Sequence, residues 1–224
     1  MGRKTDKEYE EELNKIWKDY IAPAYENSTD CQYYVKDIEN CKIDNVEYII
    51  LCESPHSDEI EYKDGNPQLL PLVGDSGKSV SEFLFGKKKP IGVWLIEDLQ
   101  KEEKELPHIA IVNTCNVPLQ KVDKSQNKVK DLNLAYLRDN CKIIPELKEN
   151  LKVRLAKYTK AHTIIVCGEF AQAYYNELKN NFKTIKSLYV PHPSRNHWQF
   201  IYEHKDDIST LKWLFNKTYH IGLM

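Results

Sequence analysis

The 224-residue sequence has no excess of either charge, since 32 lysine and arginine residues stand against 34 aspartate and glutamate residues. It also has no apolar run approaching the ~20 residues of a membrane-spanning helix, so we expect no membrane partner. The formal net charge of −2 excludes a polycation. Binding of nucleic acid needs only a local basic face, however, and has to be argued from a site.

Glycine is scarce, with 8 residues, and the six cysteines include no Cys-x-x-Cys pair. The missing pair argues against a zinc site, and we expect no bound metal. Residues 1–8 are charged rather than apolar, which favours a reducing, cytoplasmic setting over secretion and disulfides. The sequence also lacks a Gly-x-Ser-x-Gly elbow, so acyl transfer is a weak alternative. We take a monomer as the simplest state.

The length and the 41% apolar content fit one folded domain over residues 1–224. Apolar residues at helical spacing predict a first helix over residues 5–21 that ends before Pro23. The rest of the predicted core spans residues 46–200. We find no internal repeat and no linker that would divide it.

Short apolar runs within this core are typical of buried strands. They cover residues 46–52, 109–113, 163–167 and 187–190. Helical patterns alternate with them, at residues 78–85, 132–158, 170–178 and 206–215. The alternation predicts an α/β fold, a three-layer α/β/α sandwich around a central, mainly parallel sheet of four strands.

Polar residues follow each predicted strand directly. These segments are Glu53-Ser54-Pro55-His56, Asn113-Thr114-Cys115-Asn116, Gly168-Glu169 and His192-Pro193-Ser194. Ligands of open α/β sheets bind at the carboxyl ends of the strands. We therefore expect the four segments to share one rim.

The segment Gly74–Ser79 contains the Gly-Lys-Ser of a phosphate loop, but Leu72 stands where that loop has its first glycine. A nucleotide triphosphatase is therefore disfavoured. The segment instead predicts a turn and a helix N-cap, with Ser76 or Ser79 bonding free N–H groups. Alternatively, those N–H groups face a DNA phosphate.

Five segments, taken in order, resemble motifs of the uracil-DNA glycosylase superfamily. Residues 51–59 resemble its first active-site motif in the Gly-Glu-Ala-Pro-Gly-x-x-Glu form of the iron–sulfur branch, and residues 71–77 resemble that branch's Pro-Phe-Val-Gly-x-Ser-Gly. Asn113 stands where the family has a uracil-reading Asn. The remaining two are residues 166–171, similar to the third strand and its Gly-x-x-Ala helix start, and residues 190–194, similar to the closing His-Pro-Ser motif.

The resemblance implies a monofunctional DNA glycosylase that flips uracil or another deaminated base out of DNA and hydrolyses its N-glycosidic bond. His192 would donate to the uracil O2 as the base leaves as an anion. Asn113 would pair with the base edge. Glu53 or Asp58 would orient the attacking water or balance the cationic sugar. The other catalytic candidates are Ser54 and His56.

Binding roles follow from the same resemblance. Pro55 would make the loop under the sugar rigid, while Leu72 holds the position of the ring that stacks on the base, and Ser194 follows the closing His-Pro. DNA contacts are expected from a set of polar and aromatic residues, with Arg195 on phosphate and Trp198 filling the vacated stack. The set is Ser76, Lys78, Arg195, Asn196 and Trp198. The Lys87–Lys89 run would add to a basic rim.

Departures from the family pattern leave alternatives open. Cys52 and His56 replace glycines of the first motif, and Leu72 replaces the stacking aromatic, for which Phe83 or Tyr62 are possible substitutes. The chain could accordingly be an inactive member that binds nucleic acid or nucleotides, or a hydrolase of free nucleosides.

An iron–sulfur cluster requires four thiolates. Cys115 and Cys141 stand near the third and fourth cluster ligands of that branch, but the opening Cys-x-x-Cys is missing. We therefore expect no cluster and no other cofactor.

Overall fold

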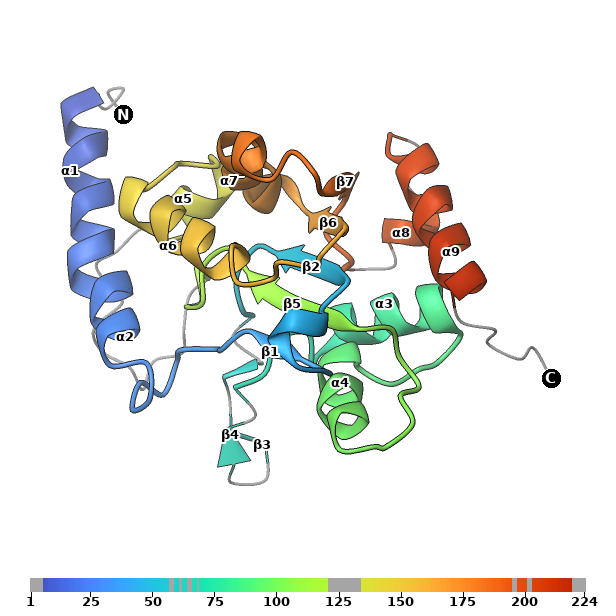
Figure 1. Ribbon diagram of the computed structural model, residues 1–224. Helices are drawn as coiled ribbons and strands as arrows, with labels where there is room; N and C mark the ends of the chain where they lie inside the picture. Colours follow the sequence, from blue (N-terminus) through green and yellow to red (C-terminus); the bar gives the residue numbers. More distant parts are fainter. Residues whose placement is uncertain are drawn as a thin grey trace.

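The computed structural model describes residues 6–56, 59–60, 62–63, 66–67, 69–120, 134–194, 197–200 and 203–218. The chain folds as an α/β protein around a sheet in the order β1-β5-β2-β6-β7 (Figure 1). The strands are β1 (Ile38–Glu39), β2 (Tyr48–Cys52), β5 (Ile109–Asn113), β6 (Thr163–Cys167) and β7 (Lys186–Val190). Four of them run parallel, and β1 pairs antiparallel with β5.

The predicted four-stranded sheet is therefore wrong by one strand, since the described sheet has five. Strand β1 has two residues, which is too short to give a recognisable alternation in the sequence. The four predicted strands are present, and β5 and β6 begin and end where the apolar runs do. In the register of the sheet, Cys52 lies beside Asn113, so two strands end at the same level.

Helices cover both faces of the sheet because β2, β5 and β6 are buried at every position. Alternate strand residues face opposite sides: Leu51 belongs to a first core and Ile50 to a second. The first core is covered by α1 (Asp6–Ile16), α2 (Ala22–Glu26), α5 (Leu134–Asp139), α6 (Pro145–Leu155) and α7 (Glu169–Leu178). The second is covered by α3 (Asp75–Phe85), α4 (Ile91–Leu99), α8 (His197–Phe200) and α9 (Lys205–Thr218).

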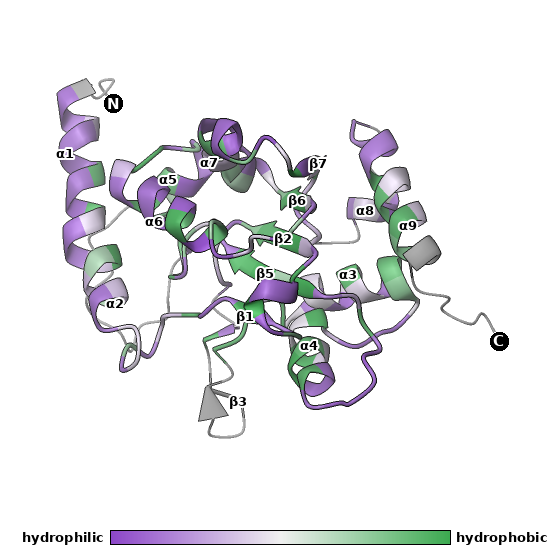
Figure 2. Ribbon diagram, viewed as in Figure 1, coloured by the Kyte–Doolittle hydropathy of each residue, from purple (hydrophilic) through white to green (hydrophobic). Residues whose placement is uncertain are grey.

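In Figure 2 the central strands are hydrophobic, whereas α1 is largely hydrophilic. Shorter elements complete the chain, namely η2 (Ile43–Asn45), β3 (Tyr62–Lys63), β4 (Asn66–Pro67) and η4 (Lys179–Asn181). Among the described residues, no helix is long and apolar enough to cross a membrane.

The first helical region continues past Pro23, contrary to the prediction that it ends before that residue. A π-helical turn, η1 (Trp17–Ile21), follows α1, and the Ala22 N–H donates to the Trp17 carbonyl five residues earlier. The wider turn accommodates Pro23, which has no N–H and would clash with the preceding turn of an α-helix. Helix α2 then carries the chain to Glu26.

The single helical pattern predicted over residues 132–158 is divided within its described part. Helix α5 ends at Asp139, Cys141 adopts a left-handed conformation with φ 48°, and Pro145 opens α6. Proline is favoured in the first turn of a helix, where no N–H is needed. Helix α4 was not predicted, although its residues are strongly apolar.

Candidate functional site

The loops that follow β2, β5 and β7 surround a pocket of about 860 Å³ at the carboxyl edge of the sheet. The start of α3 forms another wall. The connections leaving the neighbouring strands β2 and β6 pass to opposite faces of the sheet, an arrangement that opens a crevice between them. The fourth strand-end loop, Gly168-Glu169, lines an adjoining pocket of about 430 Å³.

Most of the predicted site residues lie in the larger pocket. The predicted catalytic residues that line it are Glu53, Ser54, His56 and His192. The predicted substrate-binding residues that line it are Asn113, Leu72 and Ser194. The predicted DNA-binding residues that line it are Ser76 and Lys78. Pro55 is buried and is not among the described lining residues, and Asp58, Arg195 and Asn196 lie outside the described residues.

Asn113 lines the pocket and has an unused hydrogen-bond donor. The residue ends β5 and is only 2% exposed. Its side-chain Nδ2 has no hydrogen-bond partner among the described residues. A buried donor left unpaired costs about 1–3 kcal/mol, so such a group calls for an explanation. A ligand with a carbonyl or ring-nitrogen acceptor would satisfy it.

His192 is a neutral imidazole with a defined tautomer. Burial, followed by the nearby His197, Arg138 and His56, lowers the pKa of His192 to about 4. The backbone N–H of Ser194 donates to its Nδ1 at 3.2 Å. A nitrogen that accepts a hydrogen bond carries no proton, so the ring proton lies on Nε2. His192 can therefore donate from Nε2 at neutral pH.

Glu53 lies between the two pockets and lines both. Its Oε1 accepts a hydrogen bond from the backbone N–H of Phe170, in the first turn of α7, at 3.1 Å. Burial raises the pKa of Glu53, whereas this hydrogen bond and the charge of Arg138 oppose the rise. Glu53 is thus a partly desolvated carboxyl group, of the kind that accepts a proton from water.

A second carboxylate, Glu59, holds the pocket wall in place. It is 6% exposed, and its oxygens accept from the backbone N–H groups of Leu72 at 2.9 Å and His56 at 3.3 Å. Leu72 has φ 54°, and its carbonyl accepts from the Gly92 N–H at 3.2 Å. The backbone of Leu72 is therefore held in a left-handed conformation by bonds on both sides.

The start of α3 faces the pocket without a side-chain cap. Its N-cap is Gly74, so Ser76 and Ser79 lie inside the helix, and the predicted serine N-cap is wrong. Lys78 forms a 2.9 Å ion pair with Asp75 on the same helix. Free N–H groups at a helix N-terminus attract anions. A phosphate could approach this wall.

Trp198 packs in the interior, contrary to its predicted role as a DNA contact. It is 3% exposed, its indole N–H donates to the Pro191 carbonyl at 2.7 Å, and its ring lies edge-on to Phe83. Phe83 thus packs against Trp198 and is not among the described lining residues, and the Tyr62 side chain lies outside what the structure describes. No Phe, Tyr or Trp is among the lining residues described, so Leu72 has no aromatic substitute there.

Several lining residues were not predicted as site residues, and two of them belong to both pockets. Arg138, at the end of α5, and His197, which opens α8, line both pockets. Arg138 Nη2 lies 2.7 Å from Asp139 Oδ1. No local sequence signal marks Arg138, which stands beside Asp139 in the last turn of α5.

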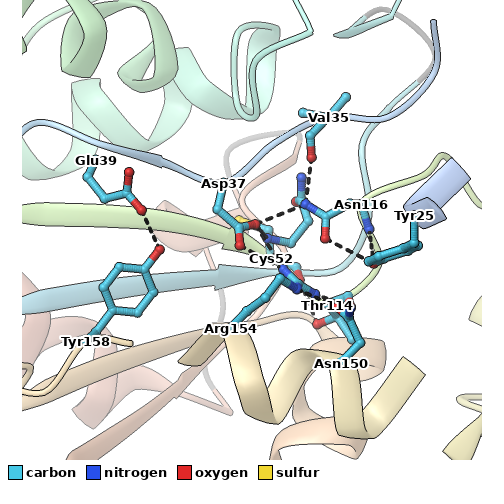
Figure 3. Close-up of polar contacts among 11 residues, drawn as sticks. Tyr25, Val35, Asp37, Glu39, Cys52, Thr114, Asn116, Asn150, Arg154 and Tyr158 are labelled. Carbon is cyan, nitrogen blue, oxygen red and sulfur yellow. Dashed lines mark hydrogen bonds and ion pairs between the residues drawn. The ribbon is translucent and has the colours of Figure 1, made fainter. Parts of the chain in front are cut away.

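Behind the pocket, a buried polar network joins the ends of β2 and β5 (Figure 3). The Thr114 N–H and hydroxyl both donate to the Cys52 carbonyl at 2.8 Å, and the Cys115 N–H donates to the Glu53 carbonyl at 3.0 Å. These bonds fix the main chain of the two strand ends that carry Glu53 and Asn113. The sequence could not reveal them, since they depend on the register of the sheet.

Asn116 fixes the far end of the segment that follows Asn113 (Figure 3). Its carboxamide Nδ2 donates to the Val35 carbonyl at 2.6 Å and to Asp37 Oδ1 at 3.0 Å. The Tyr25 hydroxyl donates to Asn116 Oδ1 at 3.0 Å and accepts from the Asn116 N–H at 2.9 Å. Helix α2 is thereby tied to the segment that follows Asn113.

The cysteines do not fit an iron–sulfur cluster. Within the described ranges, no three His, Cys, Asp or Glu side chains are grouped so that they could hold a metal ion. Cys115 is fully enclosed in the first core, and burial raises the pKa of its thiol to about 12. Cluster ligation requires thiolates. No step of the chemistry below involves a cluster.

The sequence matches no protein-family model, and a search of the curated proteins returns no match either.

Proposed function

We propose that the chain is a DNA glycosylase-like enzyme that hydrolyses the N-glycosidic bond of uracil or another deaminated base in DNA. One observation carries the proposal: an unpartnered amide, a neutral Nε2–H donor and a partly buried carboxylate line the same pocket. The motif resemblance to the uracil-DNA glycosylase superfamily supports it. On this proposal the α/β fold is the three-layer sandwich of that superfamily.

Each group has a step in the proposed reaction. Asn113 donates from Nδ2 to a base carbonyl and so selects the flipped base. His192 donates from Nε2 to the oxygen on which negative charge develops as the bond breaks. This donor is stronger toward the transition state than toward the neutral base, which is the requirement for catalysis.

Glu53 completes the reaction from the sugar side. As the base leaves, positive charge develops at C1′, and a carboxylate there stabilises it and orients the attacking water. The water oxygen bonds to C1′, its proton passes to Glu53, and the base departs as an anion that takes up a proton. The product is DNA with an abasic site. DNA bearing a damaged base is the partner this proposal requires.

A lesion panel tests the proposal. Labelled single- and double-stranded oligonucleotides carrying one uracil, hypoxanthine or xanthine are incubated with the protein and then cleaved with alkali. We expect strand breaks at one lesion or more, and His192→Ala should reduce the rate by about 10²–10³. Free deoxyuridine tests for a nucleoside hydrolase in parallel. Absence of breaks with every lesion would contradict the proposed activity.

The pocket lining also favours a second candidate, a nucleic-acid-binding module without turnover. No Phe, Tyr or Trp lines the pocket among the described residues, and stacking on such a ring is worth about 1–3 kcal/mol per base. A binding module predicts that wild-type protein binds oligonucleotides with a steep salt dependence but excises nothing. His192→Ala would then leave the affinity unchanged.

A further inference from the structure

An ion pair between Asp37 and Arg154 contacts the main chain of Asn113 and of Thr114. Figure 3 shows the pair beside Thr114. Arg154 Nη1 lies 2.9 and 3.0 Å from the two carboxylate oxygens of Asp37. Asp37 Oδ1 also accepts from the Asn113 N–H at 3.4 Å, while Arg154 Nη2 donates to the Thr114 carbonyl at 3.0 Å. The pair thus forms hydrogen bonds with the backbone N–H of Asn113 and the backbone carbonyl of Thr114.

Stability alone does not explain a pair in this place. The two side chains are 9% and 14% exposed, so both charges lose most of their hydration. Buried ion pairs can often be replaced by apolar side chains of similar size without loss of stability. Apolar side chains in place of Asp37 and Arg154 could not form hydrogen bonds with the Asn113 N–H and the Thr114 carbonyl at the end of β5.

Hydrogen bonds hold the segment that follows β5, but the side-chain amide nitrogen of Asn113 takes part in none among the described residues. The N–H groups of Thr114 and Cys115 are bonded, and so is the carboxamide nitrogen of Asn116. Asn113 Nδ2 has no partner in the described part of the chain. The direction of this amide decides what it reads, because its donor matches the O4 carbonyl of uracil and a reversed amide matches cytosine instead.

We propose that Asp37 and Arg154 are positioning residues: by holding the main chain at Asn113 and Thr114, they fix the place of the Asn113 side chain and thereby how its amide meets a base in the pocket. This inference rests on the proposed function. Neither residue is among the described lining residues, so both act through Asn113 rather than on the substrate.

A double-mutant cycle tests the inference. Asp37→Leu and Arg154→Met are combined so that no buried charge is left alone, and Asn113→Ala is introduced both in this background and in the wild type. Asn113→Ala should reduce kcat/KM for uracil at least tenfold less in the double variant than in the wild type. Each kcat/KM is expressed per folded molecule, with the folded fraction of every variant measured by denaturation, so that loss of folded protein alone cannot produce this result. An equal reduction in both backgrounds overturns the inference.

A matched control and a second variant complete the design. Tyr158→Phe removes a neighbouring buried bond, between the Tyr158 hydroxyl and Glu39 at 2.6 Å, that does not touch the segment. The reduction caused by Asn113→Ala should be the same in this background as in the wild type. If the double variant does not fold, Arg154→Lys keeps the charge but loses the bond to Thr114, and the same comparison applies.

A measurement without substrate separates this inference from the proposed function. ¹⁵N relaxation of the Asn113 side-chain amide, assigned by its absence in Asn113→Ala, should report a rigid group in the wild type and a mobile one in the double variant. Equal rigidity overturns the positioning role, whether or not any base is excised. Absence of excision with a rigid wild-type amide would contradict the glycosylase proposal alone.

Discussion

The carboxylate of Glu53 occupies the space that a side chain at position 168 would fill. A Cβ added to Gly168 would lie 2.4 Å from Glu53 Oε1, and Gly168 has φ 87° and ψ 162°, a conformation almost exclusive to glycine. Gly168 therefore allows both the turn from β6 into α7 and the position of the Glu53 carboxylate between the two pockets.

Gly168→Ala should displace Glu53 and reduce base excision at least tenfold. It should also lower the free energy of unfolding by about 1–3 kcal/mol, because the backbone is strained for alanine. Gly86→Ala is the matched control: its φ is 66°, but nothing lies within 4 Å of an added Cβ. That variant should lose about 1 kcal/mol and keep its activity, as measured by denaturation and by excision kinetics. Equal activity losses in both would rule out the effect on Glu53.

Asn113→Ala should separate activity from stability. Removing the amide eliminates a buried, unpaired donor, so the melting temperature should stay the same or rise while uracil excision falls about 100-fold or more. Thermal denaturation and single-turnover excision measure the two effects. A marked loss of stability would show that Nδ2 is satisfied within the native protein.

His192 should resist protonation down to about pH 4, the value to which burial, followed by the nearby His197, Arg138 and His56, lowers its pKa. Between about pH 6.5 and 4 the unfolded chain binds the proton and the folded chain does not, so stability falls as the pH falls. The loss from this group amounts to about 3 kcal/mol at pH 4. His192→Gln should lack that loss. An imidazole NMR titration with its midpoint near 6.5 would disprove the buried neutral state.

Arg138 should influence the acid limb of the pH–activity profile. Its charge lowers the pKa values of both Glu53 and His192. In Arg138→Met both pKa values rise, and since Glu53 must be ionised and His192 neutral, activity should be lost at a higher pH than in the wild type. The kcat/KM profile between pH 4 and 8 measures the shift. An unchanged acid limb would show that Arg138 is screened from both groups.

Leu72→Phe should supply the ring that the described pocket lining lacks. Stacking on a base is worth about 1–3 kcal/mol, so the substrate should bind roughly five- to a hundredfold more tightly. Leu72 already holds φ 54°, and phenylalanine pays no more than leucine for that conformation. Oligonucleotide affinity in Leu72→Phe and wild type tests the effect. Weaker binding would mean that the ring blocks the pocket.

The sequence predicted the parts of this fold that depend on local pattern. The runs ending at Cys52, Asn113 and Cys167 are strands buried at every position, whereas the strand ending at Val190 is only partly buried. Asn113 and most of the predicted loop residues after Cys52 and Val190 line the pocket. The two-residue strand β1 could not be predicted, since it exists only by pairing with β5. The break between α5 and α6 was missed because the apolar spacing continues through Cys141.

Individual roles were harder to predict than the site itself. The sequence around Trp198 does not indicate whether its side chain is exposed or buried. Only the tertiary packing shows that Trp198 lies in the interior. Arg138 reaches the pocket through the way α5 packs, which no local pattern encodes. The unpartnered state of Asn113 Nδ2 depends on every neighbour being committed elsewhere.

The π-helical turn before Pro23 makes the amino-terminal helices part of the support of the proposed site. A π turn contains one extra residue, which rotates everything after it by about 100° relative to an unbroken α-helix. Tyr25 follows that turn and bonds Asn116 twice. A chain shortened from its amino end to beyond Tyr25 would lose activity although no residue of α1 or α2 is among the described lining residues of the pocket. Deletion mapping would then place a catalytic requirement in a helix that never meets the substrate.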